Sequence, residues 1–334
     1  MKRFTLVVLT VGMLLQPIVV LAQVNAPVVI RFAHGFSPQS LTGRSLDEWA
    51  KLVEAKSGGA AKVQIFPAAQ LYDMQSLPQA LANGNIDGGA SMTPYSTQIV
   101  PAVGIWALPS LIRNDNDAFK VAASPVATKL AAMFEAKNLH IVSWWPFGGI
   151  KWFGNKPMLT PADVKGLKVR SSADVISRVI ELMGGTPVFI EANEVYAALQ
   201  RGMIDANTIS ASSIIDRKLI EVTKHGNDIS AGYAMLMLTF NKAVWESYTP
   251  QVRAAISDAS DQIRKKVEAG VILDEDNKIK QSIAKGLKYH NATPAEQALW
   301  RKAAQPVWED FRKLNGTLGA ELLTTVMDVT GQKP

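Results

Sequence analysis

The sequence of 334 residues contains no cysteine. It therefore cannot form disulfides, thiolate nucleophiles, iron–sulfur clusters or Cys-ligated zinc sites, and it cannot carry a lipid on an N-terminal cysteine. The four histidines lie too far apart along the chain to form a metal-binding motif. They are His34, His140, His225 and His290. We expect no metal site and no cofactor.

Motifs of common catalytic sites are also missing. The chain has no G-x-S-x-G elbow, no P-loop and no G-x-G-x-x-G after a strand. Its acidic residues are scattered, and no pair indicates a general acid and base. A Ser–His–Asp triad stays open, since its members need not be adjacent in sequence. We assign no catalytic residue and expect that the protein is not an enzyme.

The charge balance is only mildly basic. Lys and Arg number 35 against 29 Asp and Glu, a net charge of +6. Lys2 and Arg3 lie in a segment that we expect to be removed, which leaves 33 against 29, or +4. This excess is too small to indicate a nucleic-acid partner, although it favours anionic ligands. With 48% hydrophobic residues, the composition is that of a globular protein of one large or two medium domains.

The first residues have the pattern of an export signal. Met1-Lys2-Arg3 precedes an apolar run from Phe4 to Val20, and Ala22 ends the segment. A charged start, an apolar centre and a small residue before the cleavage point are typical of a signal peptide. The alternative is an uncleaved membrane anchor, for which the run is short. We therefore expect cleavage after Ala22 and a periplasmic protein.

Strand and helix patterns alternate along much of the chain. Val28–Ala33 alternates like a strand, and the helical pattern of Ser45–Lys56 ends at a Gly pair. Further alternating segments to residue 90, and again from about 160 to 207, predict parallel strands covered by helices. Ala118–Lys137 is expected to be one long helix and Leu139–Trp145 a strand. The chain is mostly helical from Pro250 onward.

The frame Leu-x-x-Gly-x-Ile-Asp occurs twice, at residues 81–87 and 199–205. Each copy follows a predicted strand and helix. Coincidence is possible, because helix–Gly–strand junctions are common. We favour two similarly wound α/β lobes, which place a ligand cleft between the carboxyl ends of their strands.

Several motifs together resemble one family. The longest runs from Phe153 to Arg170 and includes Asn-Lys-Pro, Thr-Pro-Ala-Asp and Lys-Gly-Leu-Lys-Val-Arg. It is joined by Gly-Gly-Thr-Pro-Val at 184–188, Glu-Val-Tyr-Ala-Ala-Leu-Gln-Arg-Gly-Met-Ile-Asp at 194–205, Phe-Pro-Ala-Ala-Gln-Leu at 66–71 and Ala-Leu-Pro at 107–109. This set resembles the solute-binding proteins of TRAP (tripartite ATP-independent periplasmic) transporters of the DctP type, over nearly all of the chain beyond the signal.

The resemblance implies a two-lobed, type II-like periplasmic binding protein fold. We expect α/β lobes with mixed sheets, a ligand cleft between them and long C-terminal helices. The expected organisation is a signal peptide at 1–22, lobe 1 at 23–148 with a return segment at about 235–270, and lobe 2 at 149–234. The C-terminal helices, at about 271–334, are expected to pack across both lobes. The implied partners are a small carboxylate and the large and small membrane subunits of a TRAP permease, with the receptor itself a monomer.

The resemblance also implies a ligand-binding arginine. It falls on Arg170, whose always-charged fork matches a carboxylate. His34, at the end of the first strand, and Ser91, Met92 and Tyr95, after the third, are the other expected contacts in lobe 1. The Tyr95 hydroxyl suits a hydrogen bond, although aromatic packing is equally compatible with this residue.

Two departures from the family pattern bear on the ligand. Ile150 and Ile209 stand where relatives for sialic acid and dicarboxylates place a second arginine and an asparagine. Lys151 is next to Ile150 but should point to the other face of its strand. A shifted alignment would instead return Asn207 to the pocket. Trp144, Trp145 and Trp152 crowd the same strands, where core packing explains each of them.

These departures favour a monocarboxylate with an apolar or aromatic body, because a second buried carboxylate would lack a partner. A C4-dicarboxylate or sugar acid is the alternative within the family. A sensor's binding domain and an exported enzyme are alternatives outside it.

Overall fold

The computed structural model describes residues 26–332, and the predicted signal peptide lies outside this range. Ten strands form one sheet in which β2-β1-β3-β9-β4-β7-β5-β6 are successive neighbours, while β8 pairs with β4 and β10 with β8. The strands are β1 (Val28–Ala33), β2 (Ala61–Phe66), β3 (Gly88–Met92), β4 (Leu139–Gly154), β5 (Lys168–Ser171), β6 (Thr186–Phe189), β7 (Ala206–Ser210), β8 (His225–Asn227), β9 (Gly232–Asn241) and β10 (Lys288–His290).

The sheet is parallel towards both of its ends and antiparallel in the middle. β1 runs parallel to β2 and β3, and β5 runs parallel to β6 and β7. The long strands β4 and β9 pair antiparallel with each other and join the two parallel groups. The predicted α/β lobes with mixed pairing are confirmed, and the two lobes share these two strands. The residue numbers at which one lobe gives way to the other stay a prediction.

Strand β4 is more than twice as long as predicted. It continues past Trp145 through Pro146 and the Gly148–Gly149 pair to Gly154. The ladder to β9 shifts register between Pro146 and Gly148, and Gly148 has a φ of 133°. Proline cannot donate a hydrogen bond to a strand ladder, but a bulge tolerates it. The strand therefore continues through Pro146 and the glycine pair, although such a sequence normally ends a strand.

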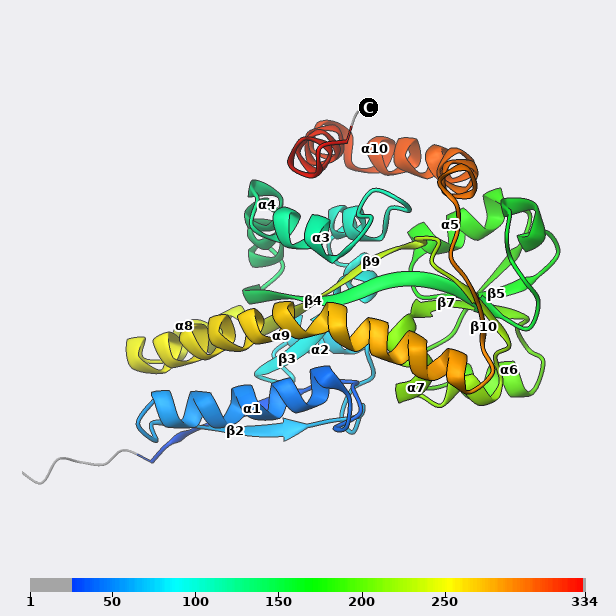
Figure 1. The fold of residues 1–334 in the computed structure, drawn as a ribbon. Coiled ribbons are helices and arrows are strands. Elements are labelled where there is room, and N and C mark those ends of the chain that lie inside the picture. The colour runs from blue at the N-terminus through cyan, green and yellow to red at the C-terminus, as the bar shows by residue number, and fades with distance from the viewer. Residues whose placement is uncertain (1–25, 333–334) are drawn as a thin grey trace, which may run out of the picture.

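Helices cover the sheet on both sides (Figure 1). They are α1 (Leu41–Lys56), α2 (Leu77–Ala82), α3 (Asp115–Ala122), α4 (Pro125–Glu135), α5 (Asp174–Leu182), α6 (Val195–Gln200), α7 (Ala211–Asp216), α8 (Lys242–Ser247), α9 (Pro250–Ala284) and α10 (Pro294–Thr330), with short 3-10 helices η1 (Thr93–Ser96), η2 (Pro101–Ala107), η3 (Pro161–Val164) and η4 (Leu219–Glu221). No helix within residues 26–332 has both the length and the apolar character needed to cross a bilayer.

The long C-terminal helices that were predicted are present as α9 and α10. α9 contacts α1 of the first lobe, then β4, then α7 of the second lobe (Figure 1). Its buried residues recur as a stripe that includes Ala259, Ile263, Val267 and Val271. α10 contacts α3 and α4 as well as α5, and it kinks at Gly316, where φ is 58°.

The single helix predicted for Ala118–Lys137 is wrong. The structure has α3 and α4 there, separated by Ala123 and Ser124. The Ser124 hydroxyl accepts from the Val126 amide and caps α4, and Pro125 takes the first helical position. The residue before a proline is driven out of helical geometry, so the helix must restart here.

The expectation of core packing for the strand tryptophans is met. Trp145 and Trp152 are fully buried, and Trp152 lies 5.0 Å from Trp300 of α10 between ring centroids. Trp144 stacks on Trp106 with centroids 6.0 Å apart. Four of these rings belong to the main hydrophobic core, and Trp144 packs against it.

Candidate functional site

A pocket lies between the lobes where the carboxyl ends of β3, β5 and β7 converge. In α/β folds this edge is where ligands bind, because side chains from several strand ends point into one space. The pocket is lined by Met74, Met92, Pro94, Tyr95, Phe147, Ile150, Arg170, Ser172, Ala192, Thr208, Ile209, Ser210, Ser213, Arg217 and Ala234. Five of the residues expected in the site, Arg170, Met92, Tyr95, Ile150 and Ile209, therefore lie together.

Arg170 is anchored from the second lobe. It lies on β5, is only 2% exposed, and donates from Nε to the Ile190 carbonyl and from Nη1 to the Thr208 carbonyl, at 2.9 and 2.8 Å. Nη2 donates to the Tyr95 hydroxyl at 2.9 Å. A guanidinium has five N–H donors, and these bonds occupy three of them. One donor on each terminal nitrogen therefore stays available to a bidentate anion.

Tyr95 is the residue of the first lobe that bonds to this arginine. It lies on η1 directly after β3, and its ring meets Phe189 of the second lobe edge-on at 6.4 Å. Burial raises the pKa of the Tyr95 hydroxyl, which keeps it protonated. Because its oxygen accepts from Arg170, its own O–H can donate to the same anion. Arg170 of the second lobe and Tyr95 of the first lobe thus place hydrogen-bond donors next to each other in one pocket.

Much of the remaining lining is apolar. Ile150 on β4 and Ile209 on β7 come from adjacent strands and are 4% and 6% exposed. The neighbour of Ile150, Lys151, turns to the other face, where its Nζ lies 3.4 Å from Glu275 of α9. The expectation that Lys151 points away from the pocket is therefore confirmed.

Three expected site residues lie outside this lining. Ser91 is buried and bonds the Thr239 hydroxyl at 2.8 Å on the neighbouring strand β9. Asn207 is fully buried beside Arg170 in register, and its side-chain amide has no partner within residues 26–332. His34 is 1% exposed, and its Nδ1 accepts from the Phe36 amide at 3.2 Å. None of the three is among the residues that line the pocket.

Arg217 was not among the site residues predicted from the sequence. It follows α7 directly and lines the pocket together with Arg170. A signal was available, because Ser210, Ser213 and Arg217 are spaced i, i+3, i+7 and share one helix face after β7. All three line the pocket. The pocket is therefore lined by two arginines, one on β5 and one directly after α7.

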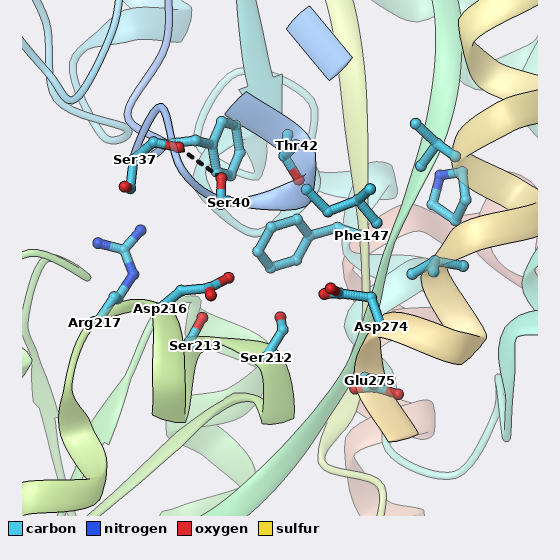
Figure 2. A pocket seen from close by; sticks show the side chains of 15 residues that line it. Ser37, Ser40, Thr42, Phe147, Ser212, Ser213, Asp216, Arg217, Asp274 and Glu275 are labelled. Carbon is cyan, nitrogen blue, oxygen red and sulfur yellow. Dashed lines mark hydrogen bonds between the residues drawn. The ribbon is translucent and has the colours of Figure 1, made fainter. Parts of the chain in front are cut away.

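A second hollow adjoins the first and shares Phe147, Ser213 and Arg217 with it. Figure 2 shows hydroxyl groups from the N-terminal side of α1 facing α7 and α9, with Phe147 between them. The acids here lie near lysines: Asp216 is 2.5 Å from Lys278 Nζ, and Glu275 faces Lys151. Burial raises the pKa of Glu275. Across the described part of the chain, no three His, Asp or Glu side chains come together in a way that would hold a metal ion.

His34 should make folding stability depend on pH. Burial lowers the pKa of this imidazole from 6.5 to about 4. The unfolded chain then binds a proton at higher pH than the folded one, so the contribution of neutral His34 is complete above pH 6.5 and is lost as the pH falls towards 4. From pH 7 to 5, the free energy of unfolding should fall by about 2 kcal/mol more in the wild type than in His34→Gln. Urea titrations measure this difference, and parallel pH profiles would contradict it.

The comparisons with known proteins agree with this architecture. The family model for bacterial extracellular solute-binding protein, family 7, matches residues 32–314. The C4-dicarboxylate-binding periplasmic protein DctP of Rhodobacter capsulatus is 27% identical over 310 residues, which cover 92% of each chain. A TRAP periplasmic solute binding protein from Sulfurospirillum deleyianum, solved with bound succinate, has 28% identity and a TM-score of 0.82, covering 91% of this chain and 100% of its own.

A third relative shares the fold. The TRAP periplasmic solute binding protein from Desulfovibrio salexigens, solved with bound orotic acid, has 23% identity and a TM-score of 0.85, and covers 91% of this chain and 98% of its own. These relatives are binding proteins by name, and the matches span nearly the whole length of each. The chain belongs to the family 7 bacterial extracellular solute-binding proteins, and it is a TRAP-type periplasmic solute-binding protein.

Proposed function

We propose that this protein captures an organic acid anion between its lobes through a carboxylate held by Arg170 and Tyr95. The observation that carries the proposal is the buried guanidinium with two donors left free beside a protonated hydroxyl from the other lobe. A buried charge is costly unless paired, so this geometry calls for an anion. Relatives that bind C4-dicarboxylates and succinate by name support a carboxylate as that anion.

The favoured ligand is a monocarboxylate with an apolar or aromatic body. Ile150 and Ile209, with Met92 and Phe147, offer apolar contact beyond the carboxylate. Each methylene group buried there contributes about 0.8 kcal/mol, whereas a buried polar group without a partner costs about 1–3 kcal/mol. A ligand with a branched or aromatic body therefore gains more binding free energy from these apolar side chains than a ligand with a short polar body.

The biological role follows from the family. We propose that the exported receptor, after removal of residues 1–22, delivers its ligand in the periplasm to the large and small membrane subunits of a TRAP permease. It acts as a monomer and turns nothing over. Closure of the lobes, which completes the donor set at Arg170, gives the permease a surface that differs between the empty and the loaded receptor.

Competition calorimetry with four acids tests the ligand class. We expect phenylpyruvate and 2-oxoisocaproate to bind at least about tenfold more tightly than succinate and malate, since the apolar wall favours the larger bodies. Incubation of each acid with the protein, followed by product analysis, is the control for catalysis and should return the acid unchanged. Tight binding of succinate or malate, without binding of either apolar acid, would exclude the monocarboxylate proposal.

A further inference from the structure

Arg217 stands where three hollows of the cleft meet. It lines the inner pocket with Arg170, the hollow beside α9, and a third hollow at the mouth that includes Ser37, Ala68 and Tyr196. Figure 2 shows its side chain leaving the end of α7 and reaching towards the wall that carries Ser37. Its side chain therefore borders the inner pocket and both adjoining hollows.

Most of the donors of Arg217 are unused. Its one hydrogen bond among the described residues runs from Nη1 to Asn193 Oδ1, and it makes no ion pair within residues 26–332. Of five N–H donors, four are free for solvent or ligand. The side chain is half-buried, and burial, with the like charge of Arg170 as a further cause, lowers its pKa. The unused donors of Arg217 are therefore available to an acceptor in the pocket that it lines.

The surroundings indicate the kind of acceptor. Glu191 adjoins Ala192 of the pocket lining, its Oε1 is buried without a hydrogen-bond partner within residues 26–332, and its carboxylate acts favourably on Arg217. A second full negative charge would meet the repulsion of this carboxylate, whereas a neutral oxygen would not. Tyr95, Arg170 and Arg217 line the same pocket, and the positive charges of both arginines act on the Tyr95 hydroxyl.

We propose that Arg217 donates a hydrogen bond to a neutral oxygen next to the ligand carboxylate, so that the receptor selects 2-oxo or 2-hydroxy acids over plain carboxylates. This inference rests on the proposed capture of a carboxylate by Arg170. Arg170 and Tyr95 bind the carboxylate, and Ile150 and Ile209 contact the apolar body of the ligand. Arg217 donates to the oxygen on the carbon that joins the carboxylate to this body. A plain acid would leave the free donors of Arg217 without a partner in a partly desolvated site.

Acids that differ only in the oxo oxygen distinguish a hydrogen bond from Arg217 to that oxygen from a general attraction of Arg217 for anions. Calorimetry compares 2-oxoisocaproate with 4-methylpentanoate, which lacks only the oxo oxygen, and with succinate. The wild type should prefer the oxo acid by about tenfold or more, and Arg217→Gln should reduce that preference to about threefold or less. Arg217→Lys keeps the charge without the fork and should retain only part of the preference. Arg201→Gln removes one exposed positive charge from α6's end, outside the three hollows, and should leave the preference intact.

The other outcomes of these titrations would reject the role of Arg217 or the proposed function itself. An equal loss of affinity for both monocarboxylates in Arg217→Gln, or an unchanged preference, would contradict recognition of the oxo oxygen by Arg217. If succinate loses the most affinity, the acceptor is a second carboxylate and the proposal of a neutral oxygen is rejected. A wild type that binds none of these acids would overturn both this inference and the proposed function. Retained preference in Arg217→Gln, with affinity still lost in Arg170→Lys, would reject this inference alone.

Discussion

Replacing Arg170 by lysine is expected to lower the affinity for the carboxylate ligand by about 100-fold, while the protein still folds. Lysine keeps the positive charge but presents no planar fork, so it cannot hold two protein carbonyls, the Tyr95 hydroxyl and a bidentate carboxylate together. Loss of one partner from a desolvated charge pair costs about 2–5 kcal/mol, which brackets this factor. Isothermal titration calorimetry with the tightest acid from the ligand screen measures it.

Arg31→Lys is the matched control for Arg170→Lys. Arg31 lies on β1, is half-exposed, and pairs with Asp87 through two nitrogens, so the substitution is the same in chemistry but lies outside the pocket. Its ligand affinity should stay within about twofold of wild type, because exposed pairs contribute little. Circular dichroism of both variants establishes that they are folded. Unchanged affinity in Arg170→Lys would remove this residue from the site.

The second large effect is expected in stability. Gly232→Ala should lower the free energy of unfolding by about 3 kcal/mol or more, because the position combines positive φ with close backbone approach. Its φ is 143°, and a Cβ atom there would lie 2.6 Å from the Ala107 carbonyl oxygen. Gly232 pairs in register with Ile150, so relief of the clash would also move the pocket wall.

Gly202→Ala separates the two causes of the stability loss in Gly232→Ala, which are the positive φ and the close approach of the Ala107 backbone. Gly202 has a φ of 67°, and nothing lies within 4 Å of the position that its Cβ would take. The backbone cost alone, about 1–2 kcal/mol, should therefore appear in this variant. Urea denaturation of both proteins compares the effects. Equal losses would show that contact with Ala107 contributes nothing at Gly232.

Local sequence patterns determined much of this protein. The alternation in Val28–Ala33 predicted β1 with its observed bounds, because a strand with one buried face repeats every two residues. The same alternation placed Ile150 and Lys151 on opposite faces. The motif ending at Arg170 put that residue on a short strand whose end opens into the cleft. Each of these features depends on neighbours in the chain, and so the sequence alone carries it.

Features that depend on distant segments were decided by the tertiary structure. Strand β4 runs through Pro146 because β9 supplies a ladder on its flank and a bulge absorbs the proline. His34 follows β1 as predicted, whereas Ser91 lies within β3 and not after it. Contacts with Phe36 and Thr239 hold the two side chains away from the pocket lining. No spacing rule states which neighbour a side chain at a strand end will meet, because several segments compete for the same space.

Arg217 shows this division most clearly. Its helical spacing from Ser210 and Ser213 is visible in the sequence, but that spacing only defines a polar face. Whether such a face meets solvent or a ligand depends on how α7 is placed, and α7 packs against α9, which begins 33 residues beyond Arg217. The sequence by itself determined the two-lobed α/β fold and the strand that carries Arg170, for which we propose a carboxylate ligand. Only the assembled lobes brought a second arginine beside it, since contacts between remote segments are set by burial and not by local pattern.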